Sequence, residues 1–221
     1  MSVSLPNGAV ISIASAMVAV AVSITAISNA SPAVATATGH TLADGDVVVL
    51  SVPAWPALNG RVVRVIDKAD GTFALEGVDT TDTKRFPAGS GAGSARKVQS
   101  WTAITQVLEA NMSGGEQQFY NYQFLEDTGD ERQIPTIRSA RSQTLSIADD
   151  DSLPHYAVLD AADAERKTRA VWLQMPNGAR TYYPAYVSFS KVPTLTKNQA
   201  MALSVTLSLD AEPMRYAGDQ A

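Results

Sequence analysis

The chain has 221 residues, no cysteine and a net charge of -5 at neutral pH. The lack of cysteine excludes disulfide bonds, zinc–thiolate sites and cysteine nucleophiles. The negative charge argues against tight nucleic-acid binding, which needs clustered Lys and Arg to displace counterions from phosphates. Ordinary apolar content indicates a folded protein.

An uncharged stretch at residues 9–27 could be mistaken for a membrane helix. Val18, Val20, Val22 and Ile24 alternate with small or polar residues, a period of two that is typical of a strand. No Lys or Arg precedes the stretch, as a signal peptide would require. We therefore expect strands here, with a secretion or membrane signal as the less favoured alternative.

Residues 33–97 differ in character from the flanking sequence. Turn signals punctuate them at Asp44-Gly45, Asn59-Gly60 and Asp70-Gly71. Short strands at such regular spacing are typical of a small barrel or sandwich. Strand-like sequence of the earlier kind resumes at Trp101. We expect residues 33–97 to be an inserted small β-domain, and residues 1–32 and 98–221 to form the core.

Residues 114–139 are predicted to form a long arm with a polar tip. Aromatic residues fall on both faces of its first strand, at Phe119, Tyr120, Tyr122 and Phe124. A core strand would show one clearly polar face. The tip that follows contains Glu126, Asp127, Asp130, Glu131 and Arg132. Dense aromatics on an arm suit a protein interface, and packing on the chain's own barrel is the alternative.

One helix is expected near residues 152–167. Asp149, Asp150 and Asp151 precede it and suit the positive end of the helix dipole. Ser152 is the predicted cap, and Pro154 is compatible with the first turn.

The C-terminal part is predicted to be a hairpin followed by a long strand. Asn177-Gly178 tolerates positive φ at both central positions of a type I′ turn. Residues 201–209 alternate strictly, with Met201, Leu203, Val205, Leu207 and Leu209 on the apolar side. The expected fold is therefore mainly β: a β-sandwich or barrel of two antiparallel sheets with one flanking α-helix.

No pattern of residues indicates catalysis or metal binding. His40 and His155 are the only histidines, and neither has the spacing of a metal site. The run at residues 149–151 lacks the spaced oxygens of a calcium loop, and residues 89–94 lack the Lys of a phosphate-binding loop. We assign no catalytic residue, metal or cofactor, and do not expect an enzyme.

Several short motifs carry a family resemblance. In order they are Trp101-Thr-Ala-Ile104, Gly114-Gly-Glu-Gln-Gln118, Gln133-Ile-Pro-Thr136, Ala148-Asp-Asp150, Met175-Pro-Asn-Gly178, Tyr182-Tyr183, Val192-Pro-Thr194, Asn198 and Met214-Arg-Tyr216. With these motifs residues 98–216 resemble the tail tube (major tail) protein of long, flexible-tailed bacteriophages (siphophages). The first thirty residues resemble it more loosely.

The resemblance implies a structural virion protein that self-assembles into stacked hexameric rings. These form the tail tube, the conduit for DNA ejection, which DNA crosses without specific binding. It implies the chain itself as partner, together with tape measure, tail terminator and tail-tip proteins, and no membrane. The location would be the virion tail, with assembly in the host cytoplasm. The arm, from Phe119 to Arg132, would contact the neighbouring ring.

The inserted domain departs from this family pattern, because a minimal tail tube protein lacks it. It would be displayed on the tube exterior. The alternative hypothesis is a host-surface or glycan-binding adhesin that acts through this domain, with Trp55 and Phe86 as contact aromatics.

Overall fold

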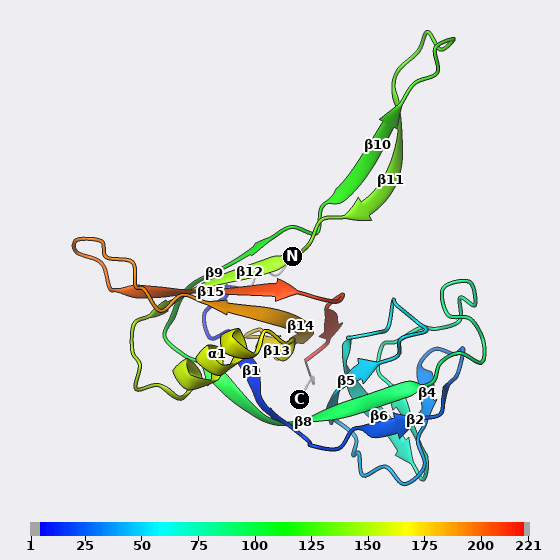
Figure 1. Cartoon of the computed structure of the whole chain (residues 1–221), viewed down its shortest axis with the longest axis horizontal. Helices are drawn as coiled ribbons and strands as arrows, with labels where there is room; N and C mark the ends of the chain where they lie inside the picture. Colours follow the sequence, from blue (N-terminus) through cyan, green and yellow to red (C-terminus); the bar gives the residue numbers. More distant parts are fainter. Residues whose placement is uncertain (1–4, 219–221) are drawn as a thin grey trace.

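The computed structural model describes residues 5–218 and shows a mainly β protein (Figure 1). Fourteen of the described strands belong to one hydrogen-bonded sheet, and two more form a separate hairpin. Every described strand pair is antiparallel, and one helix flanks the sheet. The predicted fold class is confirmed.

The large half of the sheet carries the helix. Its strands are β1 (Val10–Met17), β8 (Gly93–Ile104), β9 (Val107–Ser113), β12 (Ser142–Ala148), β13 (Arg169–Gln174), β14 (Arg180–Phe189), β15 (Ala202–Leu209) and β16 (Met214–Tyr216). In space they run β8-β1-β13-β14-β15-β12-β9, and β16 pairs with β14. Helix α1 (Pro154–Glu165) packs on β14 and β8. Leu159 of the helix, Ile13 of β1 and Val205 of β15 share one buried cluster.

Strand β15 shows the predicted alternation from Leu203 to Ser208, but Met201 lies before the strand and is exposed rather than on the buried face. Leu203, Val205 and Leu207 are buried, whereas Ser204 and Ser208 are exposed. The strand lies between β12 and β14, so both of its edges are hydrogen-bonded. It is therefore a central strand whose apolar face forms part of the core.

The hairpin between β13 and β14 forms as predicted, but its turn differs. Gly178 N–H donates to the Met175 carbonyl at 2.9 Å, and Met175 N–H donates to the Ala179 carbonyl at 2.8 Å. Gly178 has φ +80°, whereas Asn177 is not among the positive-φ residues. The loop is therefore a three-residue turn closed by a left-handed glycine, and the type I′ prediction is wrong. Pro176 explains this, because its fixed φ suits the second position of a type I turn.

Helix α1 also begins differently from the prediction. Its N-cap is Leu153, with no side-chain capping hydrogen bond. Ser152 instead donates from its N–H and its hydroxyl to the Asp150 carboxylate, at 3.1 and 2.6 Å. These bonds lower the pKa of Asp150 and form a local turn before the helix.

The small half of the sheet has its own core. Its strands are β2 (Val22–Ile24), β3 (Ala26–Ile27), β4 (Ala33–Thr36), β5 (Val47–Ser51), β6 (Val62–Ala69), β7 (Thr72–Leu75) and the first part of β8. Trp55, Phe73 and Leu75 lie at the centre of its buried cluster. Strands β2 and β3 pair with β8 and β4, so residues 22–27 join this half rather than the expected core. Alternation predicts a strand but does not identify its pairing partner.

Strand β8 joins the two halves. Its residues 94–97 pair with β5, and its residues 98–104 pair with β1. A third buried cluster lies at this junction, made of Ala14, Val47, Val62, Val98, Ala170, Tyr182 and Tyr216. The two halves therefore share both a strand and apolar contacts.

Tyr216 adds hydrogen bonds across the junction. Its hydroxyl accepts from Arg64 N–H at 3.1 Å and donates to the Glu76 carbonyl at 3.2 Å. Burial raises the pKa of Tyr216 to about 12, so the hydroxyl stays protonated and able to donate. An ion pair between Arg61 and Glu212 lies on the same side of the junction.

The position of Val205 allows a direct test of this core. Val205→Asp places an unpaired carboxylate in the buried cluster and should lower the free energy of unfolding by about 3–5 kcal/mol. Chemical denaturation followed by circular dichroism measures it. Ser204→Asp, on the exposed face of the same strand, is the control and should cost about 1 kcal/mol or less. A Val205→Asp protein with the wild-type midpoint would contradict the assigned facing.

Candidate assembly interface

The described residues offer little reactive chemistry. Within residues 5–218 no group of three or more His, Asp or Glu side chains is placed to hold a metal. His40 makes local hydrogen bonds, accepting from Leu42 N–H at 3.2 Å. His155 lies in the first turn of α1, where it is buried beside Thr105, and desolvation lowers its pKa, which favours the neutral ring. Within residues 5–218, no helix is both long enough and apolar enough to cross a membrane.

Trp55 and Phe86 lie inside the small half. Trp55 is fully buried and meets Phe86 edge to face, with ring centroids 5.3 Å apart. Its indole N–H donates to the Pro87 carbonyl and to the Ser90 hydroxyl, each at 3.1 Å. The expectation that these rings contact a surface ligand is therefore wrong. They form part of the core, where large aromatic rings bury much apolar surface.

The predicted arm is present and projects away from the sheet (Figure 1). It consists of β10 (Gln117–Tyr122) and β11 (Arg132–Arg138), which pair only with each other among the described strands. Its large apolar side chains that are exposed are Phe119, Tyr120, Phe124, Leu125, Ile134 and Ile137. Such a concentration of exposed apolar surface is typical of an interaction site.

One face of the arm carries an ordered row of rings. Tyr120 and Tyr122 are stacked with centroids 6.4 Å apart, and Phe124 meets Tyr122 edge to face at 5.5 Å. The Arg132 guanidinium lies 5.8 Å from the Phe124 ring. These rings contact one another and belong to none of the buried clusters of the sheet, so an aromatic surface is left for a partner.

The acidic tip lies beyond this row. Glu126, Asp127, Asp130 and Glu131 with Arg132 give a net charge of -3, out of -5 for the chain. Asp127 forms an ion pair with Arg132 at 3.4 Å. Most of the protein's excess negative charge is thus concentrated at the end of the arm.

Two glycines set the direction of the arm at its base. Gly114 and Gly115 have φ of +78° and +84°. A Cβ on Gly114 would lie 1.8 Å from the Ala140 carbonyl oxygen, and one on Gly115 would lie 2.7 Å from the Arg141 Nε. Only glycine fits this close approach, so the sequence Gly114-Gly115 fixes how the arm leaves the sheet.

The sheet also has an open edge next to the arm. Strand β9 pairs with β12 on one side and is the last strand of the described path. Its exposed side chains include Leu108 and Met112, which line a groove of about 1020 Å³ with the start of β1. An unpaired apolar edge can accept a strand from another chain.

The family model for phage tail tube protein, TTP, matches residues 53–218. The chain belongs to the phage tail tube protein family. The match includes residues 53–97 as well as the region whose motifs carry the resemblance, which is thereby confirmed. The protein is a structural component of a phage tail. No curated protein matches the chain.

Solved structures similar to this tail tube protein include chains of an anti-feeding prophage and of an extracellular contractile injection system. A chain of the anti-feeding prophage baseplate is 8% identical with a TM-score of 0.39, covering 54% of this chain and 86% of that one. A chain of the anti-feeding prophage cap is 15% identical, with a TM-score of 0.35 and coverages of 49% and 79%. A chain of an extracellular contractile injection system sheath-tube complex is 11% identical, with a TM-score of 0.34 and coverages of 48% and 79%. With identities and TM-scores this low, these structures show neither the fold nor the function of this chain.

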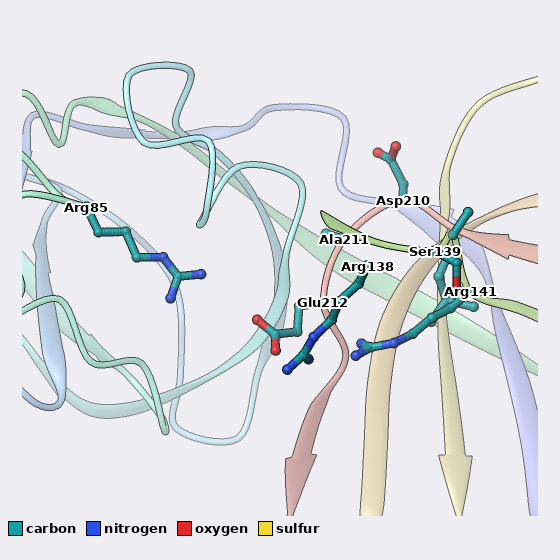
Figure 2. A pocket seen from close by; sticks show the side chains of 9 residues that line it. Arg85, Arg138, Ser139, Arg141, Asp210, Ala211 and Glu212 are labelled. Carbon is teal, nitrogen blue, oxygen red and sulfur yellow. The ribbon is translucent and has the colours of Figure 1, made fainter. Parts of the chain in front are cut away.

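Sequence analysis missed one group of residues in the tail tube protein. Arg85 and Arg141 come from separate loops and Arg138 from the end of β11, and together they line one hollow with Asp210 and Glu212 (Figure 2). No local motif could have identified it, because only the fold brings Arg85 of the small half to the base of the arm.

Substitution at Gly114 tests the geometry of the arm base. Gly114→Ala should displace the base, because its Cβ meets a backbone oxygen and its φ is left-handed, at a cost of about 1–3 kcal/mol. Trypsin should then cleave after Arg132 and Arg138 several times faster. Gly129→Ala, where nothing lies within 4 Å of the added Cβ, is the control. Equal cleavage of both variants would contradict this role.

Proposed function

We propose that this tail tube protein assembles into stacked hexameric rings whose tube conducts DNA into the host during ejection. The observation that carries the proposal is the arm: a two-stranded hairpin with an exposed aromatic face and no partner strand among the described ones. An isolated hairpin is only marginally stable in water. Burial of this face against another subunit supplies the missing stabilisation.

Two distinct surfaces support two directions of growth. The open edge of β9 suits lateral pairing with a neighbouring subunit, and such head-to-tail contacts close into a ring when the rotation allows. The arm projects away from that sheet and suits contact with the next ring (Figure 1). The sixfold number comes from the family resemblance.

The charge of the chain suits a wall that DNA passes without specific binding. Acidic residues outnumber basic ones, 22 against 17. A surface of that sign repels phosphates.

The two ends of a tube built this way differ, because one end presents arms and the other end binds them. This asymmetry suits separate partners at the ends, a tail terminator and tail-tip proteins, with a tape measure protein inside. Assembly would take place in the host cytoplasm before incorporation into the virion.

The adhesin alternative lacks support from the small half. Trp55 and Phe86, the aromatic contacts that it requires, have exposed fractions of 0% and 5%. A glycan stacks on the face of an accessible ring, which neither side chain offers. We therefore retain the tube as the function of this chain.

Loss of the aromatic face should prevent stacking. Tyr122→Ser with Phe124→Ser should leave the melting of the monomer unchanged, because neither ring contacts the core. The protein concentration needed for tube formation should rise at least about tenfold, as expected for removal of two interface aromatics. Negative-stain microscopy and sedimentation measure this.

The matched control is Tyr122→Phe with Phe124→Tyr, which keeps both rings and should form tubes normally. Tubes of wild-type length and yield from the serine variant would rule out an interface role for this face.

A further inference from the structure

The hollow at the base of the arm is lined by three arginines and two acids, an excess of one positive charge. Arg138 ends β11, Arg141 precedes β12, and Arg85 lies in the loop before β8. We call these three residues the arginine cluster. Figure 2 shows Arg138 and Arg141 extending toward Glu212, with Arg85 reaching in from the opposite side. The hollow measures about 490 Å³.

The arginine cluster lacks ion pairs with the described residues 5–218. In the described part of the protein none of the three arginines forms an ion pair. Glu212 is already paired with Arg61, which leaves Asp210 as the one acid in the hollow without such a pair. Arginine stays protonated at any physiological pH. The hollow is therefore a preformed site for carboxylates or phosphates.

The arm tip carries the complementary set. Asp127 is paired with Arg132, whereas Glu126, Asp130 and Glu131 form no ion pair among the described residues. Three unpaired carboxylates at the tip thus match three unpaired guanidinium groups in the hollow. Charge complementarity of this kind fixes the register of an interface and speeds association.

The two sets cannot meet within one molecule. The cluster lies at the base of the arm, and the tip lies at its far end (Figure 1). The six-residue strand β10 separates them by about 20 Å at roughly 3.3 Å per residue. Only a second copy of the chain can bring a tip to a cluster.

We propose that the acidic tip of one subunit binds the arginine cluster of a subunit in the next ring. This rests on the proposed function, and it names the receiving surface of the arm. Tip and cluster are different surfaces of the same chain, so the contact is head-to-tail, and between rings stacked along one axis it can repeat without closing. Each added ring then presents a new set of tips for the following one.

Charge reversal tests the pairing. Arg85→Glu with Arg138→Glu should slow tube elongation at least about tenfold at low salt, while rings still form. Both residues are exposed, so the fold should be kept. Adding Asp130→Arg and Glu131→Arg to the same chain restores opposite charges and should restore elongation. Arg96→Glu with Lys68→Glu makes the same charge change on exposed residues outside the hollow and is the control.

Light scattering and electron microscopy provide the readout. Loss of elongation in the first variant and its recovery in the four-residue variant would support the pairing. Equal elongation of wild type and Arg85→Glu/Arg138→Glu would overturn it, while tubes of the wild type would leave the proposed function intact. Absence of any ring or tube from the wild type would instead refute both. Unchanged elongation with lost retention of a short DNA duplex would assign the cluster to phosphate and overturn the pairing.

Discussion

The arrangement of this tail tube protein depends on one continuous strand. β8 is hydrogen-bonded to β5 along its first part and to β1 along its second, so a single backbone ladder runs through both halves. A backbone hydrogen bond that is broken without replacement is costly when buried, and the two halves therefore cannot pivot freely. The apolar cluster around Tyr182 and Tyr216 adds a second constraint at the same place. The small half is held in a fixed position beside the base of the arm.

In the proposed assembly, this rigidity gives the small half a role. Because the ladder fixes its position, Arg85 lies beside Arg138 and Arg141, where an isolated appended domain would leave it at a variable distance. The parts proposed to reach other subunits are the arm, whose two strands pair only with each other among the described strands, and the edge of β9 that faces away from β12. Folding energy is thus concentrated in the sheet, while the exposed aromatic and charged groups are left for partners.

Local sequence patterns were sufficient to predict the structural features that depend on residues close together in the sequence. Alternation identified β15 and its buried Val205, and aromatics on both faces indicated the arm. The predictions that were wrong concern features that depend on residues distant in the sequence. Residues 22–27 form strands as predicted but join the small half, and Trp55 is a core ring because residues from several loops cover it. The arginine cluster likewise exists only after the loops are brought together. The turn at Asn177 was missed for a local reason, since Pro176 imposes a type I geometry.

The central claim is that the arm of each subunit is buried against the next ring of a tube. Cryo-electron microscopy of tubes assembled from the purified chain tests it most directly, because it resolves the position of each arm. We expect stacked rings in which the row from Tyr120 to Phe124 is covered by a neighbouring subunit. Tubes whose arms extend into solvent, or a chain that stays monomeric at high concentration, would contradict it.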